Sequence, residues 1–335
     1  MNKKEKHTLS RKGCLLSSIV IAILVITLIA PLSACSKKTE TGTVVTFNYP
    51  EWVYYDLVYL ADELGYFDNA NIKPNYVGQI AAGQMVPSLS TGDLDLVNRH
   101  TPLVISAIEA GADIKIIAAG SMSTQANPHM KYFVRIDSPI NGIEYFEGKT
   151  LGINSFGACS EFVTKKAMRD SGLDPENVKM ITAPDSEQET PLLRGDTDIA
   201  IIHPLSSGRA SANKTDFKLL MSDWDIDGGI SGMNPYTISG TFLRAHPDEV
   251  KELISILSKA ARWNNENPDE ARKLIADKFG FKLEEAEMFE FYEDQIIPEE
   301  NMQYWYDMFS ELGLVTTNKV KISDIYTNDY NLAKK

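Results

Sequence analysis

The chain has 335 residues, of which 43% are hydrophobic and 24% are charged, as in ordinary globular proteins. This composition excludes a disordered or fibrous chain, and the length predicts about two domains. The formal net charge is −13 and no dense run of Lys and Arg occurs, so we expect no nucleic-acid partner. Three Cys residues, Cys14, Cys35 and Cys159, are too few for a disulfide framework, and their spacing matches no metal-binding motif.

The N-terminus is predicted to be an export signal. Five basic residues between positions 3 and 12 precede an uncharged, mostly apolar run over 13–36, an order typical of signal peptides. The run ends in Leu32-Ser33-Ala34-Cys35, which resembles the bacterial lipoprotein signal, in which the chain is cut before the Cys and the Cys is lipidated. An uncleaved membrane helix is the alternative, because the run is nearly long enough to span a bilayer. We therefore expect a signal peptide over 1–34, a lipid on Cys35 and a polar tether over 35–42.

From residue 43 onward, short β-branched stretches alternate with stretches of helical spacing that end at Gly. The predicted strands are 43–48, 72–77, 94–98, 114–119, 150–154, 178–182, 199–202 and 218–221. The predicted helices are 54–64, 81–90, 102–110, 159–171, 187–194, 247–266, 268–279, 283–295 and 301–312. This order predicts an α/β fold with mostly parallel sheets and helices on both faces, followed by a helical C-terminal part.

A weak internal repeat supports two related lobes. Residues 84–95 and 188–198 share a Gln, a Pro, a Leu and the pattern Gly-Asp-x-Asp, and an apolar strand follows each of them. Gly can end a helix in the left-handed conformation, and Asp-x-Asp turns the chain into the next strand. Any α/β protein can make such turns, but the shared Gln and Pro favour a true repeat.

Six short motifs, in the same order, resemble those of bacterial solute-binding proteins. They are Leu60-Ala61-x-x-Leu64-Gly65-Tyr66-Phe67, Gly83-Gln84, Leu89-x-x-Gly92-Asp93-x-Asp95, Gly148-Lys149-Thr150-Leu151-Gly152-Ile153, Ala245-His246-Pro247-Asp248-x-Val250 and Trp263-x-x-x-Asn267-Pro268-x-x-Ala271. Together they span about 44–314. The chain thus resembles the sulfonate-, taurine-, nitrate- and thiamine-pyrimidine-binding group of ABC importers.

The resemblance implies a type II periplasmic-binding-protein fold, in which two lobes are joined by two crossing strands and the ligand binds between them. We place the crossings near 131–137 and 236–244, because both segments are β-rich. Lobe 1 would then be 43–132 plus 240–335, and lobe 2 would be 133–239.

The function that the resemblance implies is a non-catalytic, monomeric receptor. Such a receptor is held on the extracytoplasmic side of the membrane by lipidated Cys35, and it delivers a small anionic or aromatic molecule to an ABC permease. Nothing in the sequence indicates a cofactor, a metal ion or an obligate oligomer. The alternative is an enzyme on the same fold that acts on a pyrimidine or sulfur compound, which would need a Cys or His in the cleft.

In open parallel sheets, ligands bind beyond the carboxyl ends of the strands, and this rule selects the candidate site residues. The candidate ligand-binding residues are Tyr49, Trp52, Gln79, Arg99, His100, Ser121, Ser155, Phe156, Gly157, His203 and Trp224.

Two of these positions suit an anion. Arg99 could clamp a carboxylate, or else make a surface salt bridge. The helix entrance at 155–158 offers free backbone N–H groups, although Ser155 could simply cap the helix. We expect Arg99 and this entrance to face each other across the cleft and to hold one anionic ligand.

For the aromatic and thiol side chains, the sequence allows more than one role. The aromatic rings of Tyr49 and Trp52 could stack on a flat ligand or pack in the core. Cys159 lies in the first turn of a predicted helix, where a thiol pKa can fall, but we expect it to be a core residue.

Overall fold

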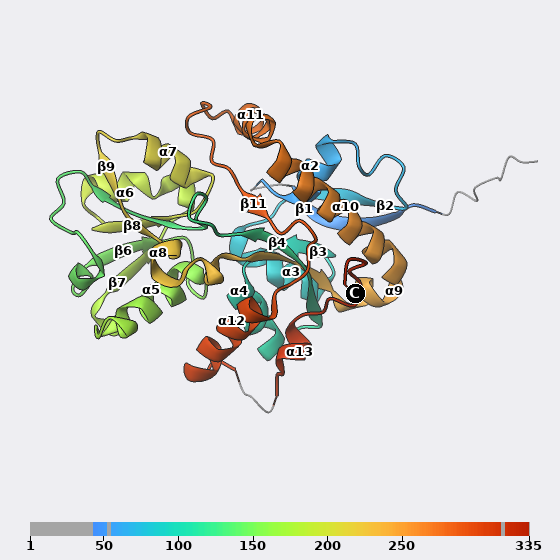
Figure 1. Cartoon of the computed structure of the whole chain (residues 1–335). Coiled ribbons are helices and arrows are strands. Elements are labelled where there is room, and N and C mark those ends of the chain that lie inside the picture. Colours follow the sequence, from blue (N-terminus) through green and yellow to red (C-terminus); the bar gives the residue numbers. More distant parts are fainter. Residues whose placement is uncertain (1–42, 52–54, 316–318, 335) are drawn as a thin grey trace, which may run out of the picture. The chain divides into compact units, whose positions relative to one another are not determined.

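The computed structural model describes residues 43–51, 55–315 and 319–334 (Figure 1). The predicted signal peptide, Cys35 and the tether lie outside the described residues, as does Trp52. In the described part of the chain, no helix is both long enough and apolar enough to cross a membrane. Residues 43–335 form one compact unit.

The strands follow the predicted order closely. They are β1 (Val45–Glu51), β2 (Ile72–Gln79), β3 (Leu96–Asn98), β4 (Ile114–Met122), β5 (Lys131–Arg135), β6 (Thr150–Ile153), β7 (Lys179–Thr182), β8 (Ile199–Ile202), β9 (Phe217–Ser222), β10 (Asn234–Ser239) and β11 (Glu290–Phe291). Every predicted strand is present, with ends that differ by a few residues.

The α-helices lie in the segments between these strands and in the C-terminal part of the chain. They are α2 (Leu57–Glu63), α3 (Met85–Thr91), α4 (Thr101–Glu109), α5 (Cys159–Asp170), α6 (Glu189–Arg194), α7 (Ser206–Ala212), α8 (Asp223–Asp227), α9 (Gly240–Ala245), α10 (Pro247–Glu266), α11 (Pro268–Phe279), α12 (Glu299–Glu311) and α13 (Ile322–Ile325). Short 3-10 turns lie at 82–84, 143–145, 175–177, 185–187 and 230–232.

The described strands form three sheets, with the orders β1-β2, β11-β4-β10-β3 and β7-β6-β8-β5-β9. Strands β1 and β2 are parallel, as are β6 and its neighbours β7 and β8. Strands β5 and β10 run antiparallel to both of their neighbours. The predicted α/β fold is therefore confirmed. Its sheets are mixed rather than mostly parallel, because β5, β10 and β11 run antiparallel to their neighbours.

Two details of the predicted elements are wrong. The second crossing segment does not stay extended to residue 244, because α9 begins at Gly240, where the Ser239 side chain caps the Phe242 N–H. The predicted helix over 283–295 is absent, and an extended segment containing β11 takes its place. Side chains of α10 hold that segment: the amide of Asn265 bonds both backbone groups of Phe291. Tertiary hydrogen bonds thus override the local helical spacing.

The internal repeat has the same structural role in both copies. Gly92 and Gly195 end α3 and α6 in the left-handed conformation, with φ of 80° and 78°. The last Asp of each copy then accepts a 2.8 Å hydrogen bond from a strand N–H: Asp95 from Asn48 of β1, and Asp198 from Thr150 of β6. The first copy therefore ties the start of β3 to β1, and the second ties the start of β8 to β6.

The cores bring the two larger sheets together. One cluster of buried residues lies around β1, α2 and α10, and a second joins side chains of α4 and α12 to side chains of β6 and α5. Phe162 of α5 and Phe309 of α12 meet with ring centroids 4.9 Å apart. In Figure 1, α12 lies beside α4 and on the side of the four-stranded sheet that faces α5. This packing sets loops of both sheets against one another.

Candidate functional site

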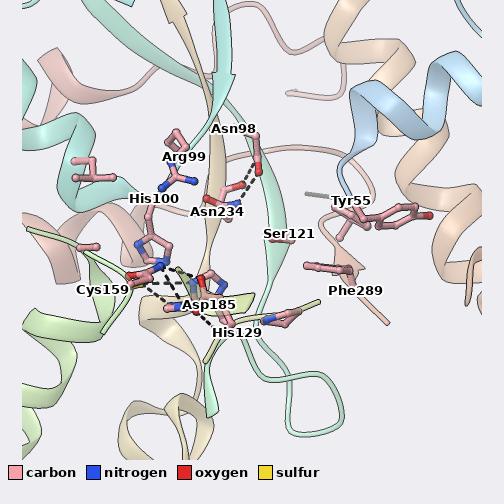
Figure 2. Close-up of a pocket in the computed structure, with 16 residues that line it drawn as sticks. Tyr55, Asn98, Arg99, His100, Ser121, His129, Cys159, Asp185, Asn234 and Phe289 are labelled. Atoms are coloured by element: carbon pink, nitrogen blue, oxygen red, sulfur yellow. Dashed lines mark hydrogen bonds and ion pairs between the residues drawn. The ribbon is translucent and has the colours of Figure 1, made fainter. Parts of the chain in front are cut away.

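A pocket lies where loops of the four-stranded sheet meet loops of the five-stranded sheet (Figure 2). The loop after β3 contributes Arg99 and His100, and Cys159 lies at the start of α5, after the loop that follows β6. Asp185 follows β7 and His203 follows β8. The carboxyl ends of four strands therefore converge on this pocket, as the strand-end rule predicts.

An amide pair fixes one wall of the pocket. The Asn98 Nδ2 donates to the backbone oxygen of Asn234 at 2.7 Å, and the Asn234 Nδ2 donates to Asn98 Oδ1 at 2.6 Å. Beside this pair, Gly120 of β4 has φ +70°, and a Cβ there would lie 2.0 Å from the Asn234 oxygen. Only Gly allows β4 and β10 to approach so closely at this point.

Arg99 is a buried cation in the same wall, with 7% of its surface exposed. Its backbone N–H donates to the oxygen of Pro235 at 3.1 Å, which anchors the loop after β3 to β10. Figure 2 shows the Arg99 side chain near Asn234 and above His100. A guanidinium in the wall presents positive charge and planar N–H donors to the pocket, so this position is suited to a ligand that carries negative charge.

Cys159, His203 and Asp185 form a linked row. The Cys159 Sγ lies 3.2 Å from His203 Nε2, and His203 Nδ1 lies 2.9 Å from Asp185 Oδ1. The same Asp185 oxygen also accepts the backbone N–H of His203 at 2.9 Å. The carboxylate therefore orients the imidazole so that its other nitrogen faces the sulfur.

Two further imidazoles complete the cluster. His129 Nε2 lies 3.6 Å from the Cys159 Sγ, and the His129 and His100 rings pack at a tilt of 36° with centroids 4.6 Å apart. The edge of the His100 ring also contacts Trp305, with the ring planes at 87°. Within the described residues, neither ring nitrogen of buried His100 has a hydrogen-bond partner. Three histidines and one cysteine thus meet in one buried space.

The environment separates the protonation states of these groups. Burial raises the pKa of the Cys159 thiol, but His100 and His203 lower it more, so the net pKa is well below the ordinary value. Burial lowers the pKa of His203, but Asp185 and the thiolate raise it well above the ordinary value. Burial and then His100 lower the pKa of His129 to about 4. These pKa shifts favour the thiolate form of Cys159, the imidazolium form of His203 and the neutral form of His129.

Comparison with known proteins shows the family to which the chain belongs. The sequence model of NMT1/THI5-like proteins matches residues 52–271. The chain belongs to the NMT1/THI5-like family. No curated protein matches the sequence of this NMT1/THI5-like chain.

Solved structures share the fold of this NMT1/THI5-like protein over most of their length. The periplasmic aliphatic sulphonate binding protein SsuA from Escherichia coli is 17% identical, with 84% of this chain and 91% of that one covered and a TM-score of 0.66. SsuA from Xanthomonas axonopodis pv. citri, bound to MOPS, is 16% identical, with 85% and 98% covered and a TM-score of 0.68. The periplasmic nitrate-binding protein NrtA from Synechocystis PCC 6803 is 12% identical, with 86% and 87% covered and a TM-score of 0.68. These likenesses confirm the predicted periplasmic-binding-protein fold.

The structure of the NMT1/THI5-like chain brings four of the predicted site residues into the pocket. These are Arg99, His100, Ser121 and His203. Gln79 and Ser155 line a neighbouring hollow that shares Asn154 and Asp185 with the pocket. Whether any of these residues touches a ligand stays a prediction.

Other predicted site residues that the structure describes do not line the pocket. Tyr49 is a core residue, 1% exposed, whose hydroxyl donates to Asp56 at 2.6 Å. Phe156 is 59% exposed and Trp224 is half-buried in α8, and neither lines the pocket. Trp52 lies outside the described residues. The aromatic walls of the pocket are formed instead by Tyr55, Phe289 and Phe291.

The helix entrance at 155–158 lies near the elements that follow β3. Arg99 and Ala158 line the same pocket, and a Cβ on Gly157 would lie 4.0 Å from the Leu103 side chain of α4. The Gly157 N–H, however, already donates to Glu161 Oε2 at 2.8 Å. An anion expected at this N–H would have to displace a carboxylate of the same helix.

Sequence reasoning missed the Cys159 cluster because its members share no spacing. Asp185 and His203 each follow a strand, so the strand-end rule could have suggested their meeting. His129 precedes β5, on the way into the five-stranded sheet, and no strand-end rule selects it. Cys159 is buried in the hydrophobic core, as expected. Its sulfur also contacts two imidazoles, which the sequence did not indicate.

Proposed function

We propose that the chain is a substrate-binding protein that captures a small molecule between its two larger sheets and delivers it to an ABC importer. The observation that carries this proposal is the pocket lined by loops of both sheets, with buried Arg99 in its wall. The family, and the fold shared with periplasmic sulfonate- and nitrate-binding proteins, support it. We keep the predicted lobes, 43–132 plus 240–335 and 133–239, as part of the proposal.

The lining of the pocket suits a small ligand with an anionic group and an apolar or aromatic body. Arg99 provides positive charge, and the amides of Asn98 and Asn234 provide polar edges. Tyr55 and Phe289, with ring centroids 5.7 Å apart, provide an apolar wall. A few convergent polar groups in a mostly apolar concavity are typical of small-molecule sites.

Closure around the ligand follows from the two-sided lining. A ligand that contacts both sheet regions only when they are close stabilises the closed arrangement by its differential affinity. The permease would then meet a closed, loaded form that differs from the empty one. Thermal-shift screening of sulfonates, nitrate, pyrimidines and aromatic carboxylates tests whether the protein binds such a ligand. A ligand at a hundredfold excess over its Kd adds about 2.7 kcal/mol of stability.

Anchoring by a lipid on Cys35 is a separate part of the proposal, since it places the receptor beside its permease. The support is the small-residue box that ends the uncharged run over 13–36. The Cys35→Ser variant should lose metabolic lipid labelling and should be left uncut or shed from the membrane. Persistent labelling of that variant would show that the lipid, if there is one, is elsewhere.

An enzyme is the second candidate, and the row Cys159–His203–Asp185 is the observation that favours it. A nucleophile, a base within hydrogen-bond reach and a carboxylate that orients the base form the arrangement of cysteine nucleophilic catalysis. The substrate would be a pyrimidine or sulfur compound. Incubation with the ligand found by screening decides between the candidates: intact recovery supports the receptor, and a product that disappears with Cys159→Ala supports the enzyme.

A further inference from the structure

His100, His129 and Cys159 form a set of three donor groups of the kind that binds metals. Each offers one ligand atom, and these atoms all lie within 4.8 Å of one another. We propose that these three side chains bind a transition-metal ion of the zinc type, with a fourth coordination position that opens into the pocket. All three residues line that pocket, so an ion held by them is reachable from the ligand space.

The distance between the Cys159 and His129 donor atoms fits tetrahedral coordination. With Zn–S of about 2.3 Å and Zn–N of about 2.0 Å, a tetrahedral site places the sulfur and a nitrogen ~3.5 Å apart. The Cys159 Sγ lies 3.6 Å from His129 Nε2. The site therefore requires little rearrangement of these two groups on metal binding.

The state of His100 is the second, independent observation. It is a buried imidazole, 5% exposed, and within the described residues neither of its ring nitrogens has a hydrogen-bond partner. Buried polar atoms nearly always have a partner, and an orphaned pair of nitrogens calls for one. A metal ion between His100, His129 and Cys159 would supply a partner for one of these two nitrogens.

Asp185 and His203 act as positioning residues for this site. Asp185 fixes the His203 ring through Nδ1, and His203 Nε2 then contacts the Cys159 sulfur at 3.2 Å. Outer partners of this kind hold ligand atoms in place and are worth 10- to 100-fold in metal affinity.

The donor set also selects the metal. A thiolate and two imidazoles favour zinc, copper, cobalt or nickel, whereas magnesium and calcium prefer oxygen donors. The nearby guanidinium of Arg99 favours an anion as the fourth ligand. The donor set therefore selects a transition-metal ion, and the anionic group of the ligand proposed above would take its fourth coordination position.

This inference deepens the proposed function, on which it rests only for the delivery of the metal to a permease. The ligands come from both sides of the pocket: His100 follows β3 of the four-stranded sheet, and Cys159 follows β6 of the five-stranded sheet. A metal held by both would favour the closed arrangement, as expected of cargo in such a receptor.

The test is cobalt and zinc binding to the full-length protein after removal of metals with a chelator. Cobalt should give a thiolate-to-cobalt charge-transfer band in the near ultraviolet that saturates at one equivalent, and zinc should displace it. Cys159→Ser should abolish the band, and His129→Asn should weaken binding by more than about 100-fold, beyond the loss of an outer partner. His246→Asn is the matched control, because His246 contacts Phe242 away from the cluster; it should bind like the unmodified chain.

Further measurements distinguish misfolding of a variant, absence of metal binding and absence of metal delivery. If Cys159→Ser fails to fold, alkylation of Cys159 in the folded protein should abolish the band instead. The proposal is overturned if no band forms, or if it persists after Cys159 is replaced or blocked. Zinc saturation with and without a small carboxylate anion shows whether the ion binds alone. If metal binds but deletion of the gene leaves cellular metal uptake unchanged, the site stands and delivery is wrong.

Discussion

The sulfur of Cys159 lies 3.2 Å from Nε2 of His203, although 44 positions separate the two residues in the sequence. Residue Cys159 begins α5 after β6, and His203 follows β8, which is the hydrogen-bonded neighbour of β6. The sheet therefore creates the contact by placing the ends of two parallel strands side by side. The carboxylate of Asp185, after β7 on the other side of β6, completes the row.

This contact predicts an unusually reactive thiol in the metal-free protein. His203 supports the thiolate form of Cys159, and the thiolate is the nucleophile. Replacement by an uncharged amide in His203→Gln should slow alkylation of Cys159 by a small reagent at least about tenfold at neutral pH. Mass spectrometry of the alkylated protein over time measures the rate. His246→Gln should alkylate at the original rate, and an equal rate in His203→Gln would show that the imidazole does not activate the sulfur.

Gly120 should tolerate no side chain. Its φ is +70° and a Cβ would lie 2.0 Å from the Asn234 oxygen, so Gly120→Ala must push β10 away from β4. We expect a loss of at least about 2 kcal/mol in the free energy of unfolding, measured by urea denaturation. Gly280→Ala is the matched control, because Gly280 has φ +69° and no atom within 4 Å of its Cβ position. Equal losses in the two variants would mean that conformation, not the close approach, determines the cost.

Asp56 should make stability fall as pH rises. Burial raises its pKa to about 6, against the lowering effect of hydrogen bonds from Tyr49 and Tyr59. The folded protein thus holds the Asp56 proton more tightly than the unfolded chain does. This contribution is complete below pH ~4, where both states are protonated, and is lost as pH rises through about 6.

Asp56→Asn removes the titration and measures the effect. Relative to this variant, the unmodified protein should lose up to about 3 kcal/mol of unfolding free energy between pH 4 and pH 7. Urea denaturation at several pH values gives the difference. Asp62→Asn, on the exposed side of α2, should follow the unmodified protein throughout. A constant difference between Asp56→Asn and the unmodified protein would contradict the raised pKa.

The sequence predicts the order of the elements because each strand and helix carries a local pattern. The Gly-Asp-x-Asp repeat is informative for the same reason: Gly92 and Gly195 act within their own turns. The segment before α12 could not be predicted locally, because Asn264 and Asn265 of α10 hold it extended through tertiary hydrogen bonds.

The residues of the candidate site also differ in whether a pattern along the chain could predict them. Arg99 and His203 were predictable because they follow strands, and strand ends converge. For Tyr49, the sequence could not distinguish ligand contact from core packing, because its burial depends on the hydrogen bond to Asp56 and on packing against Phe47. The meeting of His100, His129 and Cys159 depends on two sheets and a crossing segment, and no spacing along the chain records it.

The central claim is that the pocket beside Arg99 is the ligand site of a binding protein. The most direct measurement is the ligand-induced rise in melting temperature of the full chain, compared between the unmodified protein, Arg99→Ala, Arg99→Lys and the exposed control Arg194→Ala, with the anionic ligand found by screening. Losing one side of a buried charged contact costs about 2–5 kcal/mol, so Arg99→Ala should abolish the rise and Arg99→Lys should keep part of it. Arg194→Ala should respond fully. An undiminished rise in Arg99→Ala, with a normal melting temperature without ligand, would contradict the account and place the ligand elsewhere.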